Sequence, residues 1–299
     1  MFFQQIVNGL TLGGVYALIA LGYTMVYGIL ELINFAHGEI YMLGAYLGII
    51  FLGFFTAIGL THSNIILALA LTFVLSVIFC SAYGFTVEKI AYRPLRNAPR
   101  LSPLISAIGV SIFLQNYVML AQGTTDKVFP HIFGSSGFGL MNARITYIQV
   151  FIVATSFVLM IALHLFVVKT KMGKAMRAVA QDKTMASLVG INIDRIISMT
   201  FVIGSGLAAI AGLMVAMYYG LVNYFIGYVA GIKAFTAAVL GGIGSIPGAM
   251  LGGIVLGLVE SFGASYISSE YKDAYAFALL IIILLIKPTG LLGTRSIEK

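Results

Sequence analysis

Apolar stretches of about 20 residues recur along the whole chain, and each is long enough to cross the hydrocarbon core of a membrane as a helix. The chain is 60% hydrophobic and only 9% charged, whereas about 25% of the residues in a soluble domain are charged. Too few polar side chains remain to cover a soluble surface, so the composition excludes a soluble fold. The nine candidate spans lie at about 6–29, 40–60, 64–87, 101–121, 147–168, 196–219, 228–244, 247–266 and 274–287.

These segments predict an all-α, polytopic membrane helix bundle of about eight to nine spans, formed by one domain over residues 1–299. Two places interrupt the pattern. The stretch from Leu30 to Glu39 (LELINFAHGE) is too polar to face lipid, and little more than the segment from Ser245 to Pro247 separates the seventh and eighth candidates. Broken or re-entrant helices are tolerated at membrane depth only where protein covers them or where they line a wet cavity. Both breaks therefore indicate the substrate pathway.

Basic residues cluster in three loops, and the excess of Lys and Arg in cytoplasmic loops predicts that all three are cytoplasmic. The C-terminus is then cytoplasmic, and the N-terminus is external if all nine candidates span. The net charge of +7 is thus a signal of topology, and the sequence lacks the soluble basic module with aromatic platforms that nucleic-acid binding needs. The loop residues are Lys89, Arg93, Arg96 and Arg100; Lys169, Lys171, Lys174, Arg177, Lys183 and Arg195; and Lys287, Arg295 and Lys299.

Glycines four residues apart, such as Gly9 with Gly13 and Gly253 with Gly257, predict seams where helices approach closely. In the stretch 237–257 (AAVLGGIGSIPGAMLGGIVLG), glycines together with Pro247 also break the helix. Tight packing alone and lining of the substrate path both account for this second break. Its candidate pathway residues are Gly241, Gly242, Gly244 and Gly248.

At the first break the candidate pathway residues are polar: Asn34, His37 and Glu39. A path that conducts a small solute needs to be roomy and mildly polar without binding the solute tightly, because strong binding would slow its release. These three side chains fit that description.

The segment from Lys169 to Arg195 is the longest basic loop, and it predicts an amphipathic helical insertion. Met172, Met176 and Val179 share helical spacing, and Gly190 ends a second short helix. An apolar face exposed on a loop needs either a partner protein or the membrane surface to cover it. The pattern alone leaves both open.

Four motifs resemble the permease family of branched-chain amino-acid ABC importers, the LivHM subfamily. They are INFAHGEIYMLGAY (33–46), AYRPLR (91–96), LISAIGVSIFLQNY (104–117) and KAFTAAVLGGIGSIPGA (233–249). The loop 169–195 resembles the coupling segment of ABC permeases only in part: Ala186 and Gly190 match the general Glu-Ala-Ala pattern, whereas Thr184 and Met185 occupy its first two places.

The resemblance implies a permease of the bacterial inner membrane that carries leucine, isoleucine or valine and binds no cofactor itself. Its implied partners are a second permease of the LivM type, two cytoplasmic ATPases of the LivG and LivF type that bind ATP, a periplasmic binding protein and membrane lipid. The residues expected to contact an ATPase are Arg177, Asp182, Ala186 and Gly190. Consistent with this expectation, Gly173-Lys174 is followed by Ala175, so the chain lacks a phosphate-binding P-loop.

A proton-coupled secondary transporter of small amphipathic solutes is the alternative, because intramembrane charges are functional-site hypotheses by default. An enzyme is not expected: the spans contain neither an HExxH nor a GxSxG motif, and Cys80 is the only cysteine. The groups that motivate the alternative are Glu31, His37, Glu39, His164, Lys233 and Glu260.

Overall fold

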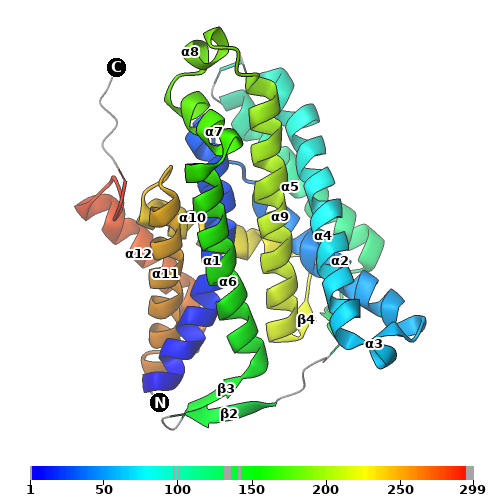
Figure 1. The fold of residues 1–299 in the computed structure, drawn as a ribbon. Coiled ribbons are helices and arrows are strands. Elements are labelled where there is room, and N and C mark those ends of the chain that lie inside the picture. The colour runs from blue at the N-terminus through cyan, green and yellow to red at the C-terminus, as the bar shows by residue number, and fades with distance from the viewer. Residues whose placement is uncertain (1, 97, 100, 131–135, 141–142, 294–299) are drawn as a thin grey trace. The chain divides into compact units, whose positions relative to one another are not determined.

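The computed structural model describes residues 2–96, 98–99, 101–130, 136–140 and 143–293, and helices dominate it (Figure 1). The helices are α1 Phe2–Leu30, α2 His37–Ala57, α3 Leu60–Ser63, α4 Ile65–Val87, α5 Leu101–Gln122, α6 Tyr147–Lys169, α7 Lys171–Gln181, α8 Lys183–Leu188, α9 Ile193–Tyr219, α10 Ile226–Gly241, α11 Ile246–Tyr266 and α12 Lys272–Ile286. A π-helical turn (Glu88–Tyr92) and a 3₁₀ turn (Arg93–Leu95) continue α4, and a second 3₁₀ turn (Ser269–Tyr271) precedes α12. The strands are β1 Lys127–Val128, β2 Gly137–Leu140, β3 Ala143–Thr146 and β4 Leu221–Val222.

All nine predicted segments form helices, which confirms the all-α polytopic bundle. Within the described part of the chain, seven helices are long and apolar enough to cross a membrane: α1, α2, α4 with its continuation to Leu95, α5, α6, α9 and α11. The other two predicted segments form α10, of 16 residues, and α12, of 15 residues, and both are shorter than the roughly 20 residues of a full span. The count of eight to nine spans stays a prediction.

The chain divides into two compact units. Unit 1 lies within Met1–Glu31, Ser135–Ile197 and Ile232–Lys299, and unit 2 lies within Leu32–Gly134 and Ser198–Gly231. The helices α9 and α10 each begin in one unit and end in the other. The expectation of a single permease domain stays a prediction.

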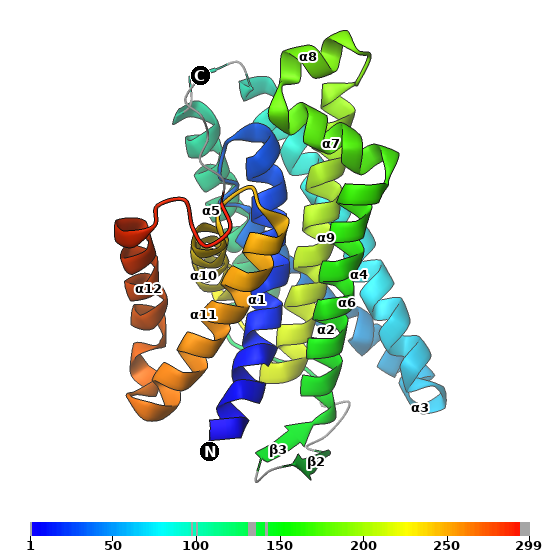
Figure 2. The same ribbon diagram turned by 60° about the vertical axis from the view of Figure 1, so that its left-hand side comes forward.

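In unit 1, α1 runs beside α11 and α6 (Figures 1 and 2). The predicted glycine seam lies along the contact with α11: a Cβ atom at Gly9 or Gly13 would lie 2.8 Å from the backbone of Leu258 or Ile254. Gly253 and Gly257 meet the α1 backbone just as closely. The four-residue spacing of these glycines therefore does mark a close helix contact.

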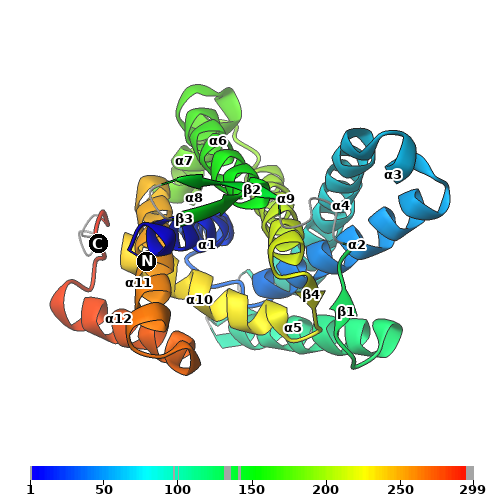
Figure 3. The same cartoon turned by 90° about the horizontal axis from the view of Figure 1, so that it is seen from below.

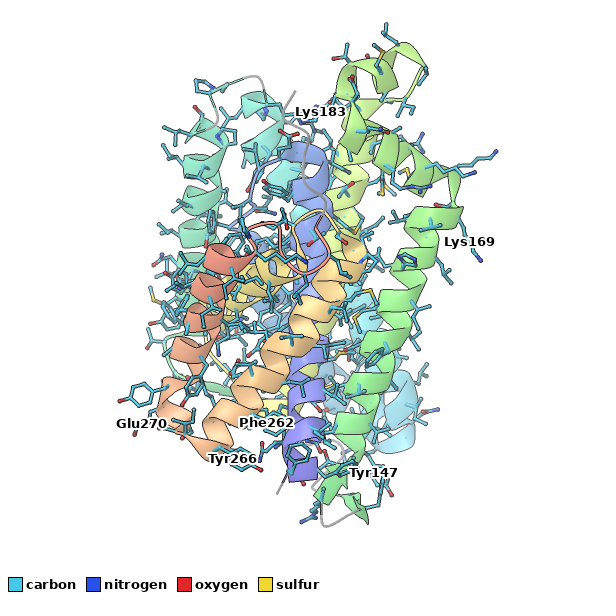
Figure 4. The ribbon with its side chains drawn as sticks, turned by 90° about the vertical axis from the view of Figure 1, so that its left-hand side faces the viewer. Tyr147, Lys169, Lys183, Phe262, Tyr266 and Glu270 are labelled. Carbon is cyan, nitrogen blue, oxygen red and sulfur yellow. The ribbon has the colours of Figure 1, made fainter. Side chains whose placement is uncertain are left out.

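A two-stranded antiparallel hairpin, β2–β3, leads into α6 at one end of unit 1 (Figure 3). Thr146 and Gln149 then start α6 with a capping box, in which each side chain accepts a hydrogen bond from the other residue's backbone N–H. At the opposite end of this 23-residue helix, Lys169 precedes α7 and α8 (Figure 4).

In unit 2, α2 packs against α4, α5 and α9. A Cβ atom at Gly44 would lie 2.6 Å from the Cα atom of Ala209, so α2 and α9 also meet across a glycine. The short strands β1 and β4 pair antiparallel, with Lys127 opposite Val222. Large apolar side chains such as Ile66 on α4 and Leu120 on α5 are about four-fifths exposed, as expected of helix faces that contact lipid.

Figure 4 shows that different kinds of side chain lie at the two ends of unit 1. Lys169 and Lys183 lie at one end, and Tyr147, Phe262, Tyr266 and Glu270 lie at the other. The rings of Phe262 and Tyr266 stack at 6.0 Å. Aromatic side chains near helix ends are typical of membrane interfaces, and basic residues mark the cytoplasmic side. The cytoplasmic location of α7 and α8 stays a prediction.

Candidate functional site

The first predicted break is a helix interruption: α1 ends at Leu30 and α2 begins at His37. Asn34, His37 and Glu39 are all at least 98% buried. The side-chain oxygen of Asn34 accepts a hydrogen bond from the Tyr92 hydroxyl at 2.8 Å. The polar residues of the break are therefore held inside unit 2 and are not exposed to lipid.

Glu39 lies in the first turn of α2, where the helix dipole favours a negative charge. Its Oε1 atom accepts a hydrogen bond from Ser111 of α5 at 3.1 Å, whereas its Oε2 atom has no hydrogen-bond partner. A Cβ atom at Gly227 of α10 would lie 2.6 Å from that Oε2 atom. The Glu39 carboxylate thus packs against the backbone of Gly227, which has no side chain, and its Oε2 atom stays open to a further contact. Sequence reasoning named Glu39 but neither Ser111 nor Gly227.

The second predicted break also coincides with helix ends, since α10 ends at Gly241 and α11 begins at Ile246. Gly242 and Gly244 have φ angles of +105° and +93°, which only glycine adopts without strain. The backbones at Gly241 and Gly248 meet so closely that neither position has room for a Cβ atom. Packing therefore accounts for these two glycines, and their role in lining the substrate path stays a prediction.

A C-terminal segment covers the end of α10. The backbone N–H groups of Leu291 and Leu292 donate hydrogen bonds to the carbonyl oxygens of Leu240 and Gly241, at 2.8 and 2.9 Å. Gly242 has no room for a Cβ atom because Gly293 lies against it. These bonds satisfy two carbonyl oxygens that have no partner within α10. The turn at the second break is therefore fixed by the C-terminal segment as well as by its own close backbone contacts.

The apolar face of α7 is covered within the chain itself, so the expectation that it is exposed was wrong. Met176 and Val179 are at least 97% buried, because α7 packs against α6 and α1. The exposed apolar side chains of the insertion lie instead on and after α8: Met185 is 61% exposed, Leu188 74% and Val189 76%. Helical spacing alone does not tell whether a face packs on its own chain.

Three of the four predicted coupling residues shape α8. Asp182 caps its start by accepting a hydrogen bond from the Met185 N–H at 3.0 Å. Gly190 ends it with a φ of +85°, and the bonds from Gly190 N to Ser187 O and from Ile191 N to Ala186 O form a Schellman motif. The side chain of Ala186 is buried.

Arg177, the fourth, is exposed on α7 and donates a hydrogen bond to the Val168 carbonyl at 3.2 Å. It lines a hollow in unit 1 together with residues of α1, α6 and the second break. Whether any of the four residues contacts an ATPase stays a prediction.

A buried ion pair in unit 1 joins residues that the sequence offered separately. Lys233 of α10 lies 2.9 Å from Glu260 of α11 and 2.8 Å from Asp273 of α12. The second oxygen of Glu260 accepts a hydrogen bond from the Tyr16 hydroxyl of α1 at 2.9 Å. Four helices of unit 1 therefore meet at one charged cluster.

Unit 2 has a comparable buried carboxylate that sequence reasoning missed. Glu88, in the π-helical turn after α4, is fully buried and forms an ion pair with Arg96. Its other oxygen accepts a hydrogen bond from Ser198 of α9 at 2.6 Å. The spacing of an acidic and a basic residue around the AYRPLR motif was the available signal. No group of three or more potential metal-ligating residues occurs in the described part of the chain.

Apolar helices of spanning length and charges that are buried in hydrogen-bonded clusters define a multi-pass membrane protein. The family model described as "Branched-chain amino acid transport system / permease component" matches residues 5–284. The chain belongs to this permease family.

Curated relatives match along most of their length. The LivH permease protein of the high-affinity branched-chain amino acid transport system of Salmonella typhimurium is 52% identical over 304 residues, which cover 100% of this chain and 97% of the relative. The corresponding BraD protein of Pseudomonas aeruginosa is 52% identical over 304 residues, covering 100% and 98%. A probable LivH protein of Methanocaldococcus jannaschii is 27% identical over 293 residues, covering 92% and 88%. No solved structure matches the chain.

Proposed function

We propose that this chain is the transmembrane permease subunit of an ABC importer that translocates leucine, isoleucine and valine. Full-length identity of 52% to permease proteins of branched-chain amino acid transport systems carries this conclusion. The chain itself catalyses no reaction and binds no cofactor, since ATP binds to partner subunits. It lies in a bacterial inner membrane with its C-terminus in the cytoplasm.

The partners follow from this role. A second permease of the LivM type completes the membrane part, two ATPases of the LivG and LivF type supply the energy, and a periplasmic binding protein delivers the amino acid. The exposed apolar side chains of Met185, Leu188 and Val189 support an ATPase contact, because a cytoplasmic apolar patch needs a partner to cover it. The caps at Asp182 and Gly190 make α8 a defined short helix that transmits movement.

In this mechanism, nucleotide binding closes the ATPase pair, and α7 and α8 follow that movement. The helices α6 and α9, which flank them in the sequence, then switch the path from outward-facing to inward-facing. The bound amino acid needs only transient contacts within the permease, because conduction requires sites that release their ligand. The buried Glu39, with one oxygen unpartnered, is suited to a transient contact with an ammonium group.

The secondary-transporter alternative rested on six ionisable groups near or within the predicted spans, two of which are Lys233 and Glu260. Lys233 and Glu260 are not isolated, since they pair with each other and with Asp273. A pair fixed in this way suits a structural joint between helices better than a proton relay, which needs groups that gain and lose protons in turn.

The test is co-purification of the complex from cells that express the whole transport system, with wild type and Leu188→Asp compared. We expect the substitution to remove the ATPases while the second permease stays bound, because Asp places a charge in the apolar contact. Phe138→Asp is the matched control: Phe138 is 45% exposed on β2, at the opposite end of α6.

Equal recovery of the ATPases with wild type and Leu188→Asp would refute the α8 contact. Leucine accumulation in proteoliposomes that hold this chain alone and a proton gradient would overturn the importer role itself.

A further inference from the structure

A hollow in unit 1 opens between α1, α6, α7 and the turn that joins α10 to α11. Its lining includes Thr24 and Ile29 of α1, Val167 of α6, Arg177 of α7 and Gly244 of the turn. All of these residues belong to unit 1, and the hollow lies near the end of α6 marked by Lys169. It therefore lies toward the end of unit 1 that carries the basic segment of α7 and α8.

Two polar groups point to an anionic ligand. The Thr24 hydroxyl is buried and has no hydrogen-bond partner, although a buried hydroxyl is normally paired. The Arg177 guanidinium has five N–H groups; it donates to the Val168 carbonyl, and it forms no ion pair within the described residues. Among the described residues that line the hollow, none is acidic. A carboxylate would satisfy both groups, because the guanidinium fork matches its two oxygens.

The rest of the lining is aliphatic. Met25, Ile29, Val167, Met176 and Ile246 surround the polar groups. A ligand that suits this lining has a carboxylate group and a branched, apolar side chain. Leucine, isoleucine and valine have this chemistry, and an anionic lipid with its acyl chain also combines an acidic and an apolar part.

We propose that this hollow binds an aliphatic carboxylate, namely the transported amino acid after its release on the cytoplasmic side, with its ammonium group toward the open mouth. The proposal rests on the proposed function for the identity of the cargo and the side of release. A ligand held between Arg177 and Thr24 joins α7 to α1. High product concentration on this side then holds α7 in place and slows further uptake.

Gly28 lines the hollow, so a substitution at this position can test it. The nearest atom to a Cβ built at Gly28 is the Gly244 Cα at 3.8 Å, so a larger side chain at position 28 fills the space without a collision of its Cβ. Gly28→Leu therefore occupies the hollow, and Thr24→Val removes the hydroxyl while keeping the shape of the side chain. Lys174→Gln is the matched control, because Lys174 is an exposed cation on α7 outside the lining.

The binding experiment is saturation-transfer NMR on the purified transport complex with millimolar leucine, 4-methylpentanoate or isoamylamine. We expect signals from leucine and 4-methylpentanoate but a much weaker signal from isoamylamine, which lacks the carboxylate. Gly28→Leu should abolish the carboxylate-dependent signal, Thr24→Val should weaken the affinity roughly threefold and Arg177→Gln roughly tenfold, equivalent to about 1.4 kcal/mol. Lys174→Gln should match wild type.

The transport experiment uses proteoliposomes in which the ATPases face a lumen preloaded with leucine. Preloading should lower the initial uptake rate of wild type and of Lys174→Gln severalfold, and it should leave Gly28→Leu and Thr24→Val unaffected relative to their own unloaded rates. Failure of all uptake, with or without preloading, would contradict the proposed function and not the hollow specifically.

Three outcomes would overturn the inference. The first is an unchanged carboxylate signal in Gly28→Leu. The second is an isoamylamine signal as strong as that of 4-methylpentanoate. The third is native mass spectrometry that finds an anionic phospholipid bound to wild type and lost in Gly28→Leu, while leucine binding stays the same; that result assigns the hollow to lipid.

Discussion

Replacing Lys233 by Met should be among the most destabilising single changes in unit 1. The Lys233 side chain is only 10% exposed, and that of Glu260 only 2%. Without the cation, Glu260 keeps the hydrogen bond from Tyr16 but loses its opposite charge inside the protein. Removing one partner of a buried ion pair typically costs about 3–5 kcal/mol. We expect a loss of this size in the free energy of unfolding.

The other two substitutions in the cluster should cost less, because Glu260→Gln leaves each remaining group with a partner and Asp273 is largely exposed. Glu260→Gln leaves Lys233 paired with Asp273 and lets the amide oxygen still accept from Tyr16, so about 1.5–3 kcal/mol is expected, the range for a hydrogen bond to a charged group. Asp273→Asn should cost at most about 1 kcal/mol, because the Asp273 side chain is 60% exposed and solvent screens its charge.

The assay is denaturant titration in mixed micelles, followed by circular dichroism because the chain has no tryptophan. The control is Lys272→Met, which removes a neighbouring cation that forms no ion pair within the described residues and should change the free energy by no more than about 0.5 kcal/mol. In the double variant, Lys233→Met with Glu260→Gln, the loss should fall short of the summed single losses by about 0.5–3 kcal/mol. Additive losses, or a loss for Lys233→Met no larger than that for Asp273→Asn, would refute the buried pair.

Three further changes and one control probe unit 2. Gly44→Ala should lower the free energy of unfolding by about 1–3 kcal/mol, because its Cβ would lie 2.6 Å from the α9 backbone; Gly53→Ala on the same helix has nothing within 4 Å and should be neutral or stabilising by about 0.4–1 kcal/mol. Gly227→Ala would place a Cβ 2.6 Å from the carboxylate at the start of α2 and should lower the initial rate of leucine uptake at least severalfold in proteoliposomes; a wild-type rate would contradict a role for that carboxylate. Ser198→Ala leaves one oxygen of the buried Glu88 unpaired and should cost about 1–3 kcal/mol in the same denaturant titration, where no change would show that another group replaces the serine.

The sequence predicted the parts of the fold that depend on local pattern. Nine apolar segments became nine helices, and both breaks lie where polar residues or glycines interrupt the pattern, at the start of α2 and between Gly241 and Ile246. The seam between Gly13 and α11 followed from the four-residue spacing of the glycines. The predicted bounds of the two shortest of these helices were also close, because 228–244 became α10 (Ile226–Gly241) and 274–287 became α12 (Lys272–Ile286).

Contacts between distant parts of the chain were beyond local pattern. Lys233 and Glu260 are 27 residues apart, and Tyr16 and Glu260 are 244 apart, so only the packing of four helices reveals that they form one cluster. The covered face of α7 was missed for the same reason: periodicity identifies an apolar stripe, whereas the segment that covers it is set by tertiary structure. Of the predicted site residues, the structure confirms that Gly190 ends a short helix, and it gives Asp182 a capping role that the sequence left unassigned.

Among three deeply buried carboxylates, Glu39 differs from the other two in its surroundings. Glu88 has a cation and a serine, and Glu260 has a cation and a tyrosine, so both oxygens of each are satisfied. Glu39 has only the Ser111 hydroxyl, and its second oxygen faces Gly227. A buried charge without a partner is costly, and such a cost persists where a function requires the open position. Glu88 and Glu260 therefore serve the packing of their units, whereas the contact of Glu39 with the ammonium group of a passing amino acid stays a proposal.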